Sequence, residues 1–218
     1  MIVGKARVPL LLLAVLSVLT YGCTPSRTLL KDPEAAQARS FFARIAEEAA
    51  FPVTASFSGV ARSAVREPMP FIVGVNAASP DSEKLGLYEP MGGAVAFLAS
   101  DGNVISMTRG PMADLAGLGR DTWIATGPVS LGRILSGAPG YTVSGVGGEA
   151  VRGGDGGWIL AEGRQTLFSD PGRGFLAKAE YRLGGVKATV EYPDRSVAPP
   201  RVISVVVRGM SISLQRDP

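Results

Sequence analysis

The sequence is poor in the side chains that most often carry chemistry. It contains no histidine, which removes the commonest general base and the most frequent zinc ligand. Cys23 is the only cysteine, so no intramolecular disulfide can form. There is no Gly-x-Ser-x-Gly segment, so the nucleophile of the common hydrolase fold is also missing. We therefore expect no catalytic residue, no cofactor and no metal site, and binding is favoured over catalysis.

Two features could still support catalysis or phosphate binding. Asp155 and Glu162 could act as paired carboxylates, and a cleft in which carboxylates converge would indicate an enzyme. The acidic residues of this chain otherwise stand singly, in turns or on the polar side of strands, as solvated surface groups do. The glycine-rich segment 145–157 could cradle a phosphate, but it lacks the Gly-Lys-Ser/Thr ending of such loops. Hairpin turns are the expected structure there.

The N-terminus has the pattern of a lipoprotein export signal. Lys5 and Arg7 precede an apolar run over 9–19, which is too short for a permanent membrane span. Leu19-Thr20-Tyr21-Gly22 then leads to Cys23, the arrangement that a lipoprotein signal peptidase cuts before the cysteine. The alternative is an ordinary signal peptide with an incidental cysteine. A lone exported thiol is better explained by lipidation at Cys23.

This pattern divides the chain into three parts. Residues 1–22 are expected to form the signal peptide, 23–33 the lipidated N-terminus and a tether, and 34–218 one β domain with a single core. Loss of the signal peptide would leave basic and acidic side chains nearly balanced, so the charge does not indicate a nucleic-acid partner. No second apolar stretch is long enough to span a membrane, which leaves the lipid as the main anchor.

The elements that would carry any site are mostly strands. A helix is predicted from Pro33 to about Ala50, with Asp32 as its N-cap and an apolar face that includes Ala38 and Phe42. A second, short helix is predicted from Pro128 to Leu135. Alternating apolar and polar residues separated by turn residues predict an antiparallel sheet or barrel. The expected strands are 53–64, 71–77, 84–89, 94–100, 103–108, 141–151, 158–162, 165–169, 175–183, 186–192, 202–208 and 210–215.

One segment is more specific than the rest. Lys84-Leu85-Gly86-Leu87-Tyr88-Glu89-Pro90-Met91-Gly92, continued by the apolar run 93–98, resembles the LolB family of outer-membrane lipoprotein receptors. In that family a strand ends in a Pro-Leu-Gly turn and another strand follows. Similar pieces occur in the same order elsewhere: a Gly-containing opening strand at 57–61, a helix ending in glycine at 129–140, and a closing hairpin at 200–214. A tryptophan common in the family's second strand is absent here.

The resemblance implies an unclosed antiparallel β-barrel, a half-barrel, with a few helices covering its concave side. It also implies an apolar cavity that accepts the acyl chains of lipoproteins from a periplasmic LolA-like carrier. A monomer would then insert them into the outer membrane, to which it is lipid-anchored on the periplasmic side. Thr24 offers no acidic signal for retention in the inner membrane, in agreement with this location. The alternative is an accessory lipoprotein with the same fold and no cargo transfer.

Two sets of candidate site residues follow. The first is the cavity wall, whose alternative is plain core packing; its candidates are Leu85, Leu87, Val95, Phe97, Ala177, Ala179 and Tyr181. The second is a membrane-insertion turn formed by Pro90, Met91 and Gly92, which corresponds to the family's Pro-Leu-Gly turn. Met91 is expected at the exposed tip. Its alternative role is that of a flexible side chain folded back into the core.

Overall fold

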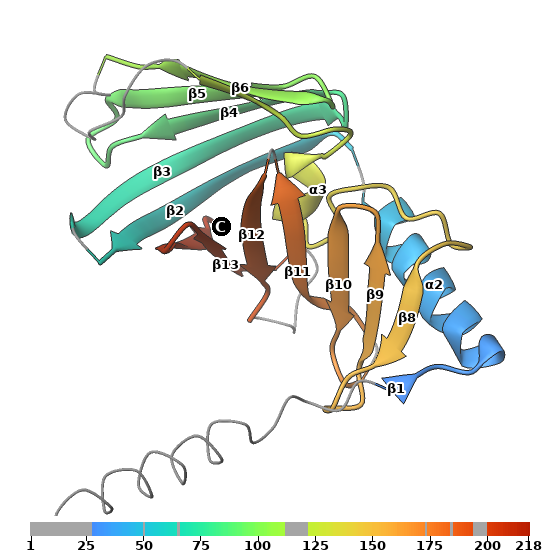
Figure 1. Ribbon diagram of the computed structural model, residues 1–218. Coiled ribbons are helices and arrows are strands. Elements are labelled where there is room, and N and C mark those ends of the chain that lie inside the picture. Colours follow the sequence, from blue (N-terminus) through green and yellow to red (C-terminus); the bar gives the residue numbers. More distant parts are fainter. Residues whose placement is uncertain are drawn as a thin grey trace, which may run out of the picture.

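The structure is a computed structural model, shown in Figure 1. It describes residues 28–49, 51–64, 66–111, 122–172, 174–183, 185–193 and 200–218. The predicted signal peptide and Cys23 lie outside the described residues, so these two predictions stand as they were made.

The strands form one antiparallel sheet that does not close into a barrel. Its order is β1-β8-β9-β10-β11-β12-β13-β14-β2-β3-β4-β5-β6-β7, so β1 and β7 are the two edges. This architecture confirms the predicted fold class. The bounds are β1 (Thr28–Leu29), β2 (Val53–Ser63), β3 (Arg66–Ser79), β4 (Ser82–Tyr88), β5 (Ala94–Ser100), β6 (Val104–Arg109), β7 (Thr122–Ala125), β8 (Glu149–Arg152), β9 (Trp158–Glu162), β10 (Gln165–Ser169), β11 (Leu176–Leu183), β12 (Val186–Glu191), β13 (Val202–Val207) and β14 (Met210–Arg216).

The last strand joins the two halves of the sheet. β14 pairs with β13 on one side and with β2 on the other. The β14–β2 register runs from Met210 opposite Ser63 to Arg216 opposite Phe57. The half formed by β2–β7 and the half formed by β8–β13 are therefore hydrogen-bonded to each other only through β14 among the described strands.

Helix α2 (Asp32–Glu47) packs against β8 and β9 at one end of the sheet (Figure 1). It buries Phe41, Phe42 and small alanines, and the Phe41 ring meets Trp158 of β9 edge-on at 5.6 Å between centroids. Its start differs from our prediction. Lys31 occupies the N-cap position without a side-chain hydrogen bond, and Asp32 lies inside the first turn. There its carboxylate interacts favourably with the positive end of the helix dipole but does not cap the helix.

Helix α3 (Leu131–Leu135) lies on the inner side of the sheet, between β3 and β11 (Figure 1). It is shorter than predicted because the Ser130 hydroxyl accepts a hydrogen bond from the Arg133 amide and so fixes the start of the helix. Gly137, with φ of 86°, ends it in the left-handed conformation typical of glycine after a helix.

The core lies on the inner face of the sheet and follows the predicted alternation. In β11, Ala179 and Tyr181 are buried, whereas Arg182 is exposed. β11 and β12 form the expected hairpin, with Leu183 opposite Val186 and a two-residue loop that includes Gly185 at φ 82°. None of the helices in the described part of the chain is long and apolar enough to cross a membrane.

Three parts of the sheet differ from the sequence prediction. Within 141–151, only Glu149–Arg152 is a strand, because Gly145 and Gly148 adopt positive φ angles and turn the chain before it. β7 was not predicted. β1 lies in the stretch expected to be a tether, yet Thr28 and Leu29 pair with β8 and extend the sheet by one strand.

Candidate functional site

The inner face of the sheet carries apolar side chains that the helices cover only in part. Strand pairing places them in rows: Leu98 lies opposite Leu85, and Ile212 lies opposite Ala61 on one side and Val205 on the other. Met210, at the start of β14, is 38% exposed. We call this set the inner apolar face; it comprises Ala61, Val73, Leu87, Leu98, Ile105, Leu183, Val205, Val207, Met210 and Ile212.

A cavity of about 390 Å³ lies near the C-terminal ends of α2 and α3. It lies on the inner side of the sheet, between these helices and the beginnings of β2 and β11. This volume is at the small end of the range for ligand pockets. Its large apolar lining residues are Ile45, Val53, Phe57, Leu135, Phe175 and Leu176.

The predicted wall residues separate into three groups. Five are buried among core side chains: Leu85, Val95, Ala177, Ala179 and Tyr181. Leu87 is partly buried and belongs to the inner apolar face. Phe97 is 43% exposed and lies on the outer face, beside Tyr88.

The position of Phe97 follows from the register of β5. Leu98 pairs with Leu85 and Ala96 pairs with Leu87, so these two β5 residues face inward. Phe97 pairs with Gly86 and therefore faces outward. Nearly every residue of β5 is apolar, so alternation alone could not distinguish its two faces. Leu98, which the sequence analysis did not select, occupies the inner position instead.

Three tyrosines hold α3 and the loops on either side of it against the sheet. The Tyr181 hydroxyl accepts a hydrogen bond from the Gly140 amide at 3.0 Å, and the Tyr192 hydroxyl donates to the Ile134 carbonyl at 2.9 Å. Tyr141 donates to the Thr126 carbonyl at 2.7 Å. Burial raises the pKa of all three phenols above the ordinary value. They therefore remain neutral, and their role here is to position the backbone.

A buried carboxylate, Glu83, fixes the start of α3. Glu83 is 1% exposed, and its two oxygens accept hydrogen bonds from the Ser130 hydroxyl and from the Leu131 and Gly132 amides. The distances are 2.5, 2.7 and 2.9 Å. With its lone pairs engaged by these donors, Glu83 links β4 to α3. No sequence signal identified it, because its partners lie almost fifty residues away.

The carboxylates considered for acid–base chemistry bind backbone amides of loops. Asp155 accepts from Gly157 at 3.0 Å, and Glu162 accepts from Ser144 at 3.0 Å. In the described part of the chain, no group of three or more acidic or cysteine side chains is placed to hold a metal ion.

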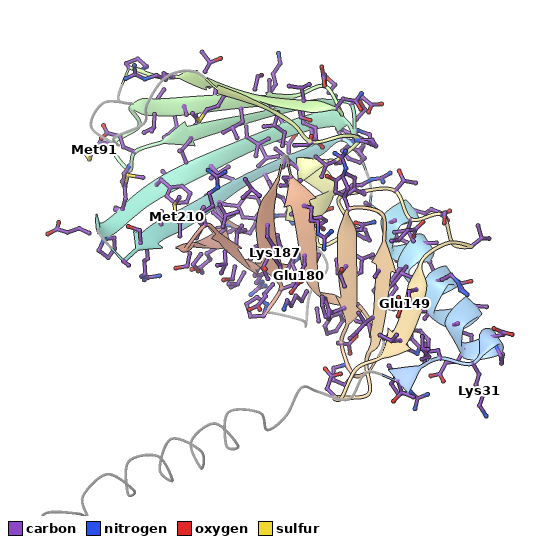
Figure 2. All side chains as sticks on the ribbon, in the orientation of Figure 1. Lys31, Met91, Glu149, Glu180, Lys187 and Met210 are labelled. Atoms are coloured by element: carbon purple, nitrogen blue, oxygen red, sulfur yellow. The ribbon has the colours of Figure 1, made fainter. Side chains whose placement is uncertain are left out.

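The turn between β4 and β5 presents Met91 to solvent. The Gly92 amide donates to the Glu89 carbonyl at 2.9 Å and closes a β-turn with Pro90 and Met91 at its centre. Gly92 has a φ of 91°, a conformation that favours glycine. The Met91 side chain is 90% exposed and points away from the sheet (Figure 2). Its exposure agrees with the expectation from the sequence.

The fold is an open, mainly β sheet whose inner apolar face is only partly covered by helices. No known protein family matches the chain, and no curated protein is similar to it in sequence. Among solved structures, it is similar to the LolA superfamily protein NE2245 from Nitrosomonas europaea, with 14% identity, a TM-score of 0.48 and coverage of 83% of this chain and 91% of that one. A putative outer membrane lipoprotein-sorting protein domain from Vibrio parahaemolyticus aligns with 9% identity, a TM-score of 0.38 and coverage of 86% and 92%.

Proposed function

We propose that this protein is an outer-membrane lipoprotein that binds acyl chains of lipoproteins on its inner apolar face and helps to insert them into the outer membrane. The observation that carries the proposal is the inner apolar face itself, which is continuous with the core but only partly covered. A contiguous row of apolar side chains that helices cover only in part is a candidate binding surface.

Acyl chains match this surface physically. Moving a chain from water onto an apolar surface is favourable by about 0.8 kcal/mol for each buried CH₂ group. Affinity then comes from buried area, and a surface without charged groups is sufficient. Because the sheet is open, the chain can enter sideways and leave again without unfolding of the domain.

The partners in this proposal are a periplasmic LolA-like carrier, which hands over the lipoprotein, and the membrane. Direct transfer between two apolar surfaces avoids exposing the acyl chains to water. The protein would act as a monomer held by lipid at Cys23 and facing the periplasm. It would bind and transfer, with no reaction to catalyse.

A second function is favoured by one specific observation. Five of the seven residues proposed from the sequence as cavity wall are buried in the core, and the inner cavity is only about 390 Å³. These facts suit an accessory lipoprotein that keeps the fold and carries no cargo. The two functions differ in one measurable property, which is saturable binding of an acyl chain.

We expect an environment-sensitive fatty-acid probe to bind the unlipidated Cys23→Ala protein saturably. Replacing half-buried Leu98 by Gln should weaken binding about tenfold or more, because a polar amide replaces apolar contact area. Fluorescence titration gives the dissociation constants, and thermal melting shows whether the variant is folded.

Phe97→Gln is the matched control, because this neighbour of Leu98 faces outward and is 43% exposed. It should leave probe binding unchanged. Absence of saturable binding, or equal effects of the two variants, would reject the acyl-binding role in favour of the accessory role.

The anchor is tested separately. Cys23→Ala should abolish incorporation of a fatty-acid analogue during growth, because the thiol that accepts the lipid is lost. Metabolic labelling followed by gel fluorescence measures this directly. Label that persists on the Cys23→Ala protein would contradict lipidation at this position, and the ordinary signal peptide would then be the better explanation of the N-terminus.

A further inference from the structure

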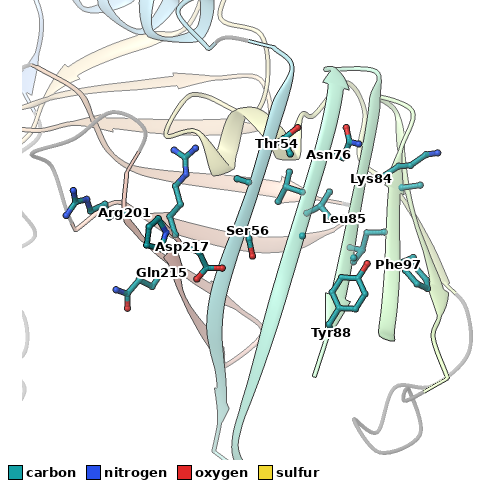
Figure 3. A pocket seen from close by; sticks show the side chains of 18 residues that line it. Thr54, Ser56, Asn76, Lys84, Leu85, Tyr88, Phe97, Arg201, Gln215 and Asp217 are labelled. Atoms are coloured by element: carbon teal, nitrogen blue, oxygen red, sulfur yellow. The ribbon is translucent and has the colours of Figure 1, made fainter. Parts of the chain in front are cut away.

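A second and larger hollow, of about 1270 Å³, lies on the outer face of the sheet, opposite to the inner apolar face. We call it the outer groove. Its floor is the row formed by Ser56, Gly74 and Gly86, which pair in register across β2, β3 and β4. The groove reaches from β14 to β5, which corresponds to about 19 Å at the usual spacing of strands. Figure 3 shows these strands and the side chains that border them.

Neither side-chain packing nor backbone conformation requires glycine at position 74. A Cβ atom built there meets only Tyr88, at an ordinary contact distance of 3.7 Å, and Gly74 is not among the residues with positive φ. Glycine inside a strand lowers stability, and where packing does not require it, it often marks a place where a ligand approaches the backbone closely. Gly86 differs, because the Tyr88 ring lies over it and occupies the space that a Cβ atom would need.

An aromatic pair forms one wall of the groove. The rings of Tyr88 and Phe97 meet edge-on, with 6.2 Å between centroids and an interplanar angle of 85°. Phe97 is 43% exposed, so its ring is accessible to a ligand in the groove. Figure 3 shows both rings along one side of the groove. A flat ligand could rest on the backbone and contact these rings.

The parts of the groove away from the Tyr88–Phe97 pair are polar. Asp217 accepts a hydrogen bond from the Ser58 hydroxyl at 2.7 Å, and its hydrogen bonds with Ser56 and Ser58 lower its pKa, so it is ionised. The side-chain amides of Asn76 and Gln215 also line the groove, and they make no hydrogen bond to another residue in the described ranges. Each amide offers both donors and an acceptor.

This lining argues against an acyl chain in the outer groove. A hydrocarbon chain would cover the Asn76 and Gln215 amides and the Asp217 carboxylate without replacing their bonds to water, which is unfavourable. A sugar ring has an apolar face for the aromatic rings and a rim of hydroxyls that both donate and accept. A flat sugar ring also fits over the open backbone at Gly74.

We infer that the outer groove binds a short, flat oligosaccharide, stacked on Tyr88 and Phe97 over Gly74 and hydrogen-bonded by Asn76, Gln215 and Asp217. This site is independent of the inner apolar face, which lies on the other side of the same sheet.

The test is calorimetric titration of the full chain, in a detergent without a sugar head group, with chitotetraose and with cellotetraose. At least one of them should bind saturably. Gly74→Val should abolish that binding, because its side chain fills the floor, while the melting temperature stays equal or rises. Phe97→Ala should weaken binding about five- to tenfold through loss of the aromatic contact.

Ala78→Val is the matched control, because Ala78 is exposed in the same strand but does not line the groove. It should bind as the unchanged protein does. The inference is overturned if neither sugar binds, if Gly74→Val and Ala78→Val bind equally well, or if Phe97→Ala has no effect. Probe binding to the inner apolar face should be the same in all these variants, so failure here leaves the proposed function untouched.

Discussion

Replacing Glu83 by Ala is expected to lower the free energy of unfolding by about 2–4 kcal/mol. The carboxylate is buried and accepts three hydrogen bonds at the start of α3. Its removal leaves the Ser130 hydroxyl and two backbone amides without an acceptor in a place that water reaches poorly. Urea unfolding followed by circular dichroism measures the loss.

Glu83→Gln keeps the shape of the side chain and one carbonyl oxygen, so it should lose about half as much stability. Glu149→Ala is the surface control, because Glu149 is exposed in β8 and should change stability by less than about 0.5 kcal/mol. If Glu83→Ala were no more destabilising than Glu149→Ala, the carboxylate would not be what holds α3 to β4.

Met91→Glu is expected to impair lipoprotein insertion strongly while leaving stability nearly unchanged; this prediction rests on the proposed function. The side chain is 90% exposed, so folding gains little from it. A carboxylate entering the hydrocarbon region costs about 2.5–3.5 kcal/mol or more, which corresponds to at least a tenfold loss of insertion. Transfer of a labelled lipoprotein to liposomes, measured beside thermal melting, gives both quantities.

Met91→Leu should retain transfer, since leucine is equally apolar. Val146→Glu is the matched control, because Val146 is 87% exposed in a different loop. Transfer that survives Met91→Glu would remove the membrane role from this turn. An equal loss for Val146→Glu would show a general effect of added charge. A large loss of stability for Met91→Glu would mean that Met91 supports the fold.

The sequence predicted secondary structure better than it predicted which residues lie next to each other in the folded protein. The β11–β12 hairpin followed directly from alternation around a glycine turn. Phe97 was placed on the wrong side because β5 is apolar on both faces, so only its pairing with Gly86 decides the direction. Glu83 was missed for a related reason, because nothing near it in the chain shows that Ser130 will lie beside it. Register and long-range contacts are set by tertiary packing, which periodicity does not record.

The pairing of β14 with β2 has a consequence for how the chain folds. β2 lies early in the sequence, yet one of its hydrogen-bonding edges stays vacant until β14, the last described strand along the chain, is in place. Until then the two halves of the sheet have no strand between them, and their apolar surfaces cannot be brought together. The sheet is therefore completed late in folding. A chain truncated before β14 would expose unpaired β edges, which promote aggregation and bind chaperones.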